Sequence, residues 1–267
     1  MLDQRKVPEA IEEFRRALTL EPNSAEAHTA LSSCRFLERD WNGVEAEIAL
    51  AVKANPKLAV TRGLYSFYLA MLERFDEEHR EAQLAEQLEP TEAFRLTAII
   101  AAFPYIGERR FDGAIAQFQK VLALDRNFSR GHNDLGGCLE AQSNYLAAVE
   151  EFRTADLLAG HDPVRVTTNY DALRKAVEVS GQKGFYQTWI DLTYAEKSIP
   201  EDQKLFSEGD LPGEYALLGD KARALDELEA HFDEPLEWHQ IKYDYHYDSL
   251  RNEPRYKALV RKAGLQP

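Results

Sequence analysis

Three prolines near the start of the chain, Pro22, Pro56 and Pro90, are separated by a constant 34 residues. Each follows a run of helix-forming residues, and proline does not continue a helix. A constant period of this length, with small and apolar residues before each proline, is typical of a helix–turn–helix repeat that packs on its neighbours. The sequence therefore predicts an all-α chain of stacked helix pairs, a shape that holds another molecule and carries no chemistry by itself.

The repeat pattern is most complete in the fifth repeat. Small residues there let two helices approach closely, and a phenylalanine fills the space that the next repeat leaves. The residues concerned are Leu135, Gly136, Ala148, Phe152 and Ala155. This pattern resembles the tetratricopeptide repeat. The resemblance implies a right-handed superhelical solenoid of antiparallel helix pairs with a degenerate C-terminal helical cap.

The repeats are predicted to occupy residues 1–163, and residues 164–267 are predicted to hold degenerate helix pairs and the cap. In the first repeat, Ala10, Phe14 and Pro22 match the second helix of a pair, and most of the first helix is missing. A solenoid normally ends in a polar cap and not in half a repeat. We therefore expect the chain to be the C-terminal part of a longer one, and the alternative is a native start with a degenerate cap.

Two irregularities are predicted inside this frame. Arg126 stands where a proline is expected, and this repeat is about two residues longer than its neighbours. Pro104 lies within its first helix, so we expect a bend at residues 103–105. Farther along, Gly181 is predicted to end a helix that begins at Val164.

A second pattern lies near the C-terminus. Residues 215–225 and 241–256 resemble the C-terminal tetratricopeptide segment of bacterial multidomain signalling proteins, where it follows winged-helix regulators, adenylate cyclases or kinases. Tyr245 and Ser249 replace two prolines of that pattern. The resemblance implies a cytoplasmic, regulatory module of a bacterial signalling or transcription-regulating protein, with an upstream effector domain in the full-length chain. The matching residues are Asp244, Asp248, Leu250, Arg251, Pro254 and Arg255.

The charge balance limits the partners. The formal net charge of −14 repels phosphate backbones, so we expect no direct contact with nucleic acid. No apolar run approaches the roughly 20 residues of a membrane helix, and the first residues lack the apolar core of a signal peptide. We therefore expect no membrane partner.

The two cysteines and the acidic pairs are expected to have structural roles and no catalytic role. Cys34 and Cys138 occupy the same repeat position three repeats apart, too far for a disulfide between helices spaced about 8–10 Å per layer. They are predicted to be two small buried thiols. Acidic pairs such as Glu77 and Glu78 are predicted to lie on a solvated helix face.

One cluster near the C-terminus has the residue types of a metal site: His239, Asp244, His246 and Asp248. His246 and Asp248 are two residues apart, a spacing that converges only on an extended backbone, so a structural cap is the favoured interpretation and a metal site the alternative. The sequence contains no Gly-rich phosphate loop and no Gly-x-Ser-x-Gly motif. We therefore expect no enzyme, no cofactor and no metal.

The resemblance to tetratricopeptide repeats places the partner-binding groove on the first helix of each pair. The residues carried over to that groove are Thr29, Ser33, Phe36, Leu37, Phe67, Met71, Phe103, Arg130, Asn133 and Glu140. Its centre is apolar and aromatic, which suits an apolar peptide or an amphipathic helix. The Lys and Asn that hold acidic chaperone C-termini in some family members are replaced by Thr29 and Ser33, so that mode is absent.

Two alternatives stay open for these residues. The side chains can pack against the first helix of the next repeat and contact no ligand. The groove can also serve as the pocket of a small-molecule or peptide sensor, with the C-terminal cap as a lid. The favoured interpretation is a protein-interaction scaffold without catalytic activity.

Overall fold

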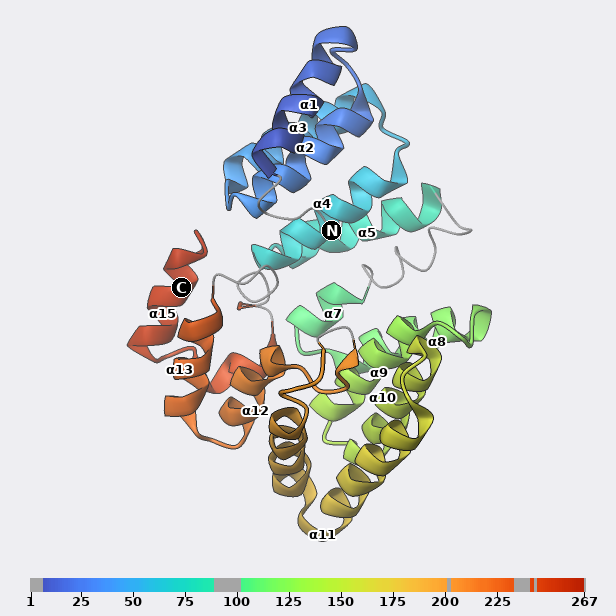
Figure 1. The fold of residues 1–267 in the computed structure, drawn as a ribbon. Helices are drawn as coiled ribbons and strands as arrows, with labels where there is room; N and C mark the ends of the chain where they lie inside the picture. Colours follow the sequence, from blue (N-terminus) through green and yellow to red (C-terminus); the bar gives the residue numbers. More distant parts are fainter. Residues whose placement is uncertain (1–6, 89–101, 201–202, 233–240, 243, 267) are drawn as a thin grey trace. The chain divides into compact units, whose positions relative to one another are not determined.

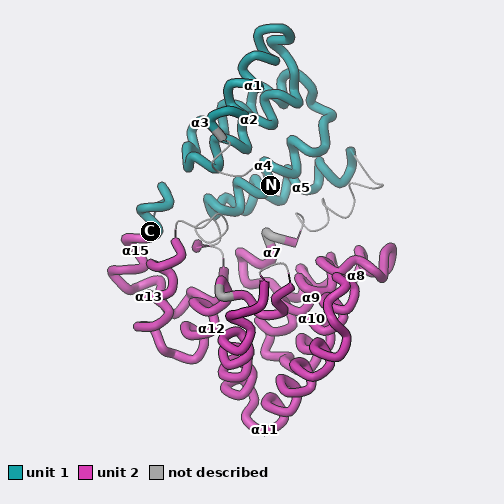
Figure 2. The backbone as a smooth tube through the Cα atoms, viewed as in Figure 1, with its two compact units in different colours: residues 1–101, 260–266 teal, residues 102–259, 267 magenta. Residues whose placement is uncertain are grey.

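The computed structural model describes residues 7–88, 102–200, 203–232, 241–242 and 244–266, apart from the side chains of Val7, Phe103, Pro104 and Glu208. All regular elements within these ranges are helices, so the predicted all-α fold of antiparallel helix pairs is confirmed. Unit 1 comprises residues 1–101 and 260–266, and unit 2 comprises residues 102–259 and 267 (Figure 2). None of the described helices combines the length and apolar character needed to cross a lipid bilayer.

Unit 1 is a run of helices in which each packs against the next. Capping residues set the helix starts: the Ser24 hydroxyl accepts a hydrogen bond from Ala27 N, and Asp40 accepts one from Gly43 N. The elements are α1 (Val7–Leu20), α2 (Ala25–Leu37), α3 (Trp41–Ala54), α4 (Ala59–Met71) and α5 (Phe75–Leu88) (Figure 1).

Unit 2 continues the same pattern and then departs from it. The first four helices again pack in sequence, and a long helix and several short elements follow. They are α7 (Phe103–Gly107), α8 (Phe111–Leu124), α9 (Ser129–Ala141), α10 (Tyr145–Ala159), α11 (Pro163–Ala195), η3 (Glu208–Asp210), α12 (Leu211–Leu217), α13 (Lys221–His231), η4 (Tyr245–Leu250) and α15 (Pro254–Lys262), whose last three residues belong to unit 1 (Figure 1).

The predicted break at Gly181 is confirmed. Within α11, Gly181 has φ 54° and ψ −135°, a conformation outside the helical region that separates two helical halves. Pro104 lies in the first turn of α7, where its missing N–H removes no helical hydrogen bond. The residues before Ala102 lie outside the described residues, so the bend predicted at residues 103–105 stays a prediction.

The turns between paired helices repeat with the sequence period. In each of four turns one residue other than glycine has a left-handed backbone, with φ between 56° and 61°. That conformation costs a residue with a side chain about 1–2 kcal/mol. The residues are Arg39, Glu73, Arg109 and Ser143.

A polar link also repeats within the helix pairs. His28 Nδ1 lies 2.7 Å from Glu47 Oε2, and His132 Nδ1 lies 2.6 Å from Glu151 Oε2. Each joins the first helix of a pair to the second across 19 positions. Sequence reasoning missed this link, although the 19-residue spacing recurs in register with the repeat.

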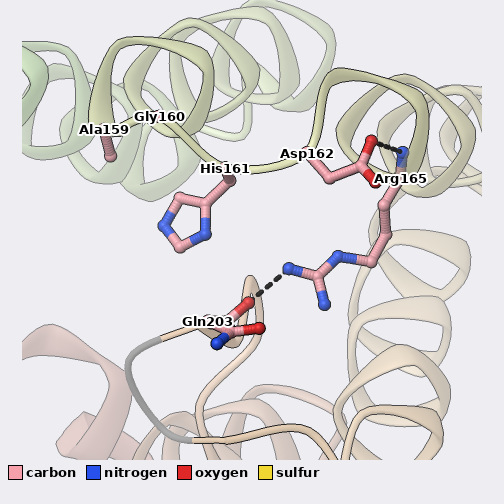
Figure 3. A pocket seen from close by; sticks show the side chains of 6 residues that line it. All are labelled: Ala159, Gly160, His161, Asp162, Arg165 and Gln203. Atoms are coloured by element: carbon pink, nitrogen blue, oxygen red, sulfur yellow. Dashed lines mark hydrogen bonds between the residues drawn. The ribbon is translucent and has the colours of Figure 1, made fainter.

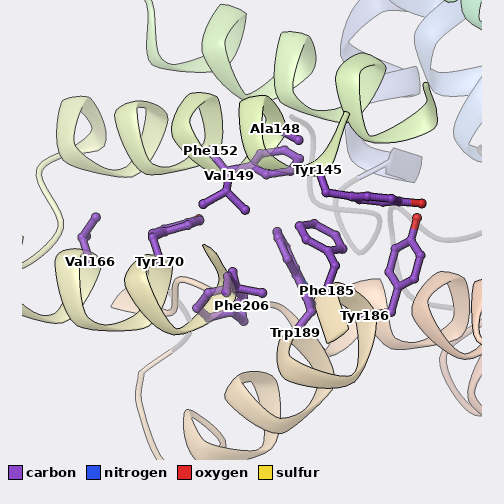
Figure 4. Close-up of a cluster of buried hydrophobic side chains, with 11 residues drawn as sticks. Tyr145, Ala148, Val149, Phe152, Val166, Tyr170, Phe185, Tyr186, Trp189 and Phe206 are labelled. Carbon is purple, nitrogen blue, oxygen red and sulfur yellow. The ribbon is translucent and has the colours of Figure 1, made fainter. Parts of the chain in front are cut away.

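An aromatic core joins α10 to α11 in unit 2 (Figure 4). The Phe152 ring meets Trp189 edge-on at 5.3 Å between centroids, and Trp189 meets Phe206 at 4.9 Å. A Cβ built on Gly136 would lie 2.7 Å from the Phe152 ring. The close helix approach predicted from this small residue is therefore present, and Phe152 occupies the space that it leaves.

Candidate functional site

A cluster of buried polar groups lies inside unit 2, where three elements far apart in the sequence meet. Glu140 comes from the last turn of α9, Glu214 from α12 and His246 from η4. One ligand atom from each lies within 4.8 Å of the other two. Glu140 and Glu214 are 5% and 4% exposed, so two carboxylates face one imidazole away from bulk water.

Local backbone features bring η4 and α12 together. Asp244 caps η4 by accepting a hydrogen bond from His246 N at 3.0 Å. A Cβ built on Gly213 would lie 3.1 Å from the His246 imidazole. The glycine therefore lets the ring pack directly against the backbone of α12, beside Glu214.

The two ring nitrogens of His246 have different partners. Nδ1 lies 2.6 Å from Asp244 Oδ1, and Nε2 lies 3.3 Å from Glu140 Oε1. Within the described residues, Glu214 Oε2 is buried and has no hydrogen-bond partner. The nearby hydroxyl of Tyr245 is also buried without one. The cluster therefore holds more hydrogen-bonding capacity than the described side chains use.

The electrostatics of the cluster follow from burial and from crowded charges. Burial, followed by the charge of Glu140, raises the pKa of Glu214 well above its usual value. Burial alone would lower the pKa of His246, but Asp244 and Glu140 outweigh it and raise that pKa well above its usual value. Burial would raise the pKa of Asp244, but the contact with His246 keeps it below the usual value.

The structure groups the C-terminal residues differently from the set considered in the sequence. His246 and Asp244 are bonded to each other, as above. Asp248 instead forms salt bridges through Oδ1, with Arg109 Nη2 at 2.5 Å and with Arg251 Nε at 2.8 Å. His239 lies outside the described residues.

Sequence reasoning did not single out Glu214 and assigned Glu140 to the groove. One signal was available for Glu214, since it is the only charged residue in the otherwise apolar helix Leu211–Leu217. A carboxylate on an apolar helix face needs a partner.

The predicted groove residues of unit 1 lie along α2 and α4. Thr29 is buried and its hydroxyl lies 2.7 Å from that of Thr61, while Ser33 accepts a hydrogen bond from Tyr68 at 3.2 Å. Met71 has no exposed surface. The remaining three, Phe36, Leu37 and Phe67, are half-buried, and the two phenylalanine rings lie 5.6 Å apart.

In unit 2 the predicted groove residues separate into two environments. Asn133 and Arg130 are both exposed, and Arg130 Nε lies 3.4 Å from Asp134 Oδ2. Glu140 is instead buried against His246. The side chain of Phe103 lies outside the described residues.

Two smaller predictions can be checked directly. Cys34 and Cys138 are free and buried, as predicted. Glu78 was expected on a solvated face, and this was wrong, because the residue has no exposed surface. It lies in α5 with Ala82 and Ala85 on the buried side of the helix.

A pocket in unit 2 lies between the end of α10 and the start of α11 (Figure 3). Arg165 crosses it and donates a hydrogen bond to the Gln203 carbonyl, while Asp162 caps α11. The pocket shares no residue with the predicted groove. Its lining residues are Ala159, Gly160, His161, Asp162, Arg165 and Gln203.

Comparisons with known proteins agree with this fold. A tetratricopeptide repeat model matches residues 2–59 and 105–162, so the chain carries tetratricopeptide repeats. No curated protein matches the sequence. Two solved structures similar to this chain are PilF of Pseudomonas aeruginosa and PilW, a widely conserved type IV pilus biogenesis factor.

The similarity to both structures is one of fold. PilF is 18% identical with a TM-score of 0.57, and the match covers 74% of this chain and 87% of PilF. PilW is 15% identical with a TM-score of 0.59, and the match covers 74% of this chain and 90% of PilW. At such identities the shared arrangement of helices assigns no pilus role.

Proposed function

Because the chain carries tetratricopeptide repeats, we propose that it is a protein-binding scaffold that holds an amphipathic helix of a partner along α2 and α4 of unit 1. The observation that carries the proposal is the repeat architecture itself, since stacked helix pairs form extended binding surfaces. The proposed contact residues are Ser33, Phe36, Leu37 and Phe67. Thr29 and Met71 are buried, so we do not include them among the contact residues.

The chemistry of these residues favours one kind of occupant. Half-buried phenylalanine rings and a leucine match the apolar face of a helix, which such surfaces recognise through side chains one turn apart. The net charge of −14 favours a basic polar face on the partner. The proposed partner segment is therefore a helix that is apolar on one face and basic on the other.

Two designed 18-residue peptides test the proposal. One arranges Leu and Lys as an amphipathic helix, and the other has the same composition in a scrambled order. We expect the full chain to bind the amphipathic peptide at least about tenfold more tightly, which is about 1.4 kcal/mol. Fluorescence anisotropy of labelled peptides measures this difference.

A matched pair of variants locates the surface. Phe67→Asp should lose the preference for the amphipathic peptide, whereas Asn133→Asp adds the same charge at an exposed site of unit 2 and should keep it. Circular dichroism melting of both variants establishes that they are folded. Equal binding of the two peptides by the wild type, or full retention by Phe67→Asp, would contradict the proposal.

We further propose a regulatory role, because residues 215–225 and 241–256 resemble segments of bacterial signalling regulators. This resemblance is the basis for proposing an effector domain upstream of the repeats and a cytoplasmic site of action. In that arrangement the scaffold would regulate the effector by binding its partner.

A further inference from the structure

We propose that Glu140, Glu214 and His246 form a binding site for a divalent transition-metal ion, zinc in the first place. Asp244 orients the imidazole in this site. The site lies entirely within unit 2 and is independent of the scaffold surface proposed on unit 1.

The donor set fits such an ion. Imidazole nitrogen and carboxylate oxygen bind zinc at about 2.0–2.2 Å, and three protein ligands with one open position are typical of its non-structural sites. Two ligands at these distances around a tetrahedral ion are about 3.3–3.6 Å apart. His246 Nε2 and Glu140 Oε1 lie 3.3 Å apart, and all three ligand atoms lie within 4.8 Å.

The orientation of His246 matches that of a metal ligand. Such a histidine usually donates its second ring N–H to a carboxylate, which fixes the tautomer and directs the other nitrogen at the ion. Asp244 Oδ1 occupies that role at 2.6 Å from Nδ1. The Nε2 lone pair then faces Glu140, and Gly213 leaves the space that the ring needs beside α12.

Glu214 supplies the independent observation. Its side chain is 4% exposed, and Oε2 has no hydrogen-bond partner within the described part of the chain. A buried carboxylate beside a second one is costly unless a cation or proton neutralises it. A cation bound by Glu140, Glu214 and His246 Nε2 would take the place of the Nε2–Glu140 hydrogen bond and would give Glu214 Oε2 a partner.

The site would also join distant parts of unit 2. Glu140 and His246 are 106 positions apart, one on a tetratricopeptide helix and the other on the C-terminal segment. An ion held by both would fix η4 and α12 against α9. Binding to the folded state alone should therefore raise the melting temperature with metal concentration.

The test uses the full chain stripped with a chelator and titrated with Zn²⁺ alone. We expect one Zn²⁺ per chain by isothermal titration calorimetry and a melting temperature that rises with Zn²⁺ concentration. Glu214→Gln keeps the shape of the side chain, so it should fold, and it replaces one carboxylate oxygen with an amide nitrogen that does not bind the ion. We expect it to bind Zn²⁺ at least about a hundredfold more weakly. Asp244→Asn should weaken binding about 10–100-fold, as loss of an orienting partner does.

A control and a second ligand variant complete the design. His132→Gln removes a histidine that also contacts a glutamate but lies outside the cluster, and it should leave Zn²⁺ affinity unchanged. His246→Gln should abolish stoichiometric binding. Absence of Zn²⁺ binding by the wild type, or equal affinity in the wild type, Glu214→Gln and His246→Gln, would overturn the metal site and assign the cluster to a shared proton.

Discussion

The helix pair α2–α3 of unit 1 and the helix pair α9–α10 of unit 2 are two versions of one repeat, related by a shift of 104 positions. Cys34 and Cys138 correspond, and so do the links His28–Glu47 and His132–Glu151. The pairs differ in the last turn of the first helix. Phe36 stacks on Tyr68 at 5.0 Å, whereas its counterpart Glu140 faces His246 at 3.3 Å.

This difference shows that the repeat fixes the place of this position in the first helix but not the chemical type of its side chain. The position is a packing site in unit 1, where an aromatic side chain contacts the next first helix. In unit 2 the same position carries a carboxylate, which needs a partner when buried. The C-terminal segment supplies that partner through His246, so the repeat frame and the degenerate region together make the cluster.

The largest expected effect concerns the corresponding thiols. Burial, followed by Asp134, raises the pKa of Cys138 to about 12, and burial also raises the pKa of Cys34. Only the thiolate reacts, and the pKa of an unperturbed thiol is about 8.5, so at pH 8 Cys138 should react at least about a thousandfold more slowly in the folded chain than in the unfolded one.

Single-cysteine variants make this a comparison of the two units. Cys34→Ala reports on unit 2 through Cys138, and Cys138→Ala reports on unit 1 through Cys34. Labelling with a thiol reagent, with and without urea, gives the two protection factors. Fast labelling of either thiol in the native chain would show that its helix pair opens readily.

An exchange of packing partners tests why the two cores differ. Ser32 and Ile48 of unit 1 correspond to Gly136 and Phe152 of unit 2, and all four are buried. Gly136→Ser should overpack the Phe152 ring, and Phe152→Ile should leave a cavity. Each should cost about 1–3 kcal/mol of unfolding free energy.

The double variant should cost less than the sum of the two, by about 0.5–3 kcal/mol, because the added side chain enters the vacated space. Urea unfolding followed by tryptophan fluorescence measures this, since Trp189 contacts Phe152. Gly137→Ala is the control, because a Cβ there would meet nothing within 4 Å. This variant should raise the unfolding free energy by up to about 1 kcal/mol through the higher helix propensity of alanine. Strictly additive costs would show that the two positions do not share one space.

The smallest expected effect concerns the turns. Ser143 has φ 61° and is exposed, so Ser143→Gly should relieve backbone strain and raise the unfolding free energy by up to about 1 kcal/mol. Ser143→Ala keeps the strain and should bring no gain. At the corresponding Arg39, the side chain also donates a hydrogen bond to the Lys262 carbonyl, so Arg39→Gly should gain less. An equal gain at both positions would contradict this reading of the turns.

The sequence predicts the repeating part of the molecule well for a physical reason. Pro22 and Pro56 lie just past the ends of α1 and α3, and the small Gly136 packs against the large ring of Phe152. Gly181 breaks α11 by its own backbone preference. Each of these features depends on neighbours within one or two repeats.

The buried cluster could not be predicted in the same way. Glu140 lies at a position that repeat geometry assigns to a binding groove, and nothing in its own repeat marks it as buried against the C-terminal segment. Its partner His246 is 106 positions away and follows no period. Glu214 is the single charged residue of an apolar helix, which indicates locally that it needs a buried partner. The identity of that partner depends on the tertiary fold.

Anomalous diffraction at the zinc absorption edge, from crystals grown with Zn²⁺, shows whether a repeat position and the degenerate C-terminal region together build a metal site in unit 2. We expect one anomalous peak within bonding distance of a carboxylate oxygen of Glu140, a carboxylate oxygen of Glu214 and His246 Nε2. A zinc-containing crystal with no peak among these three atoms would contradict it.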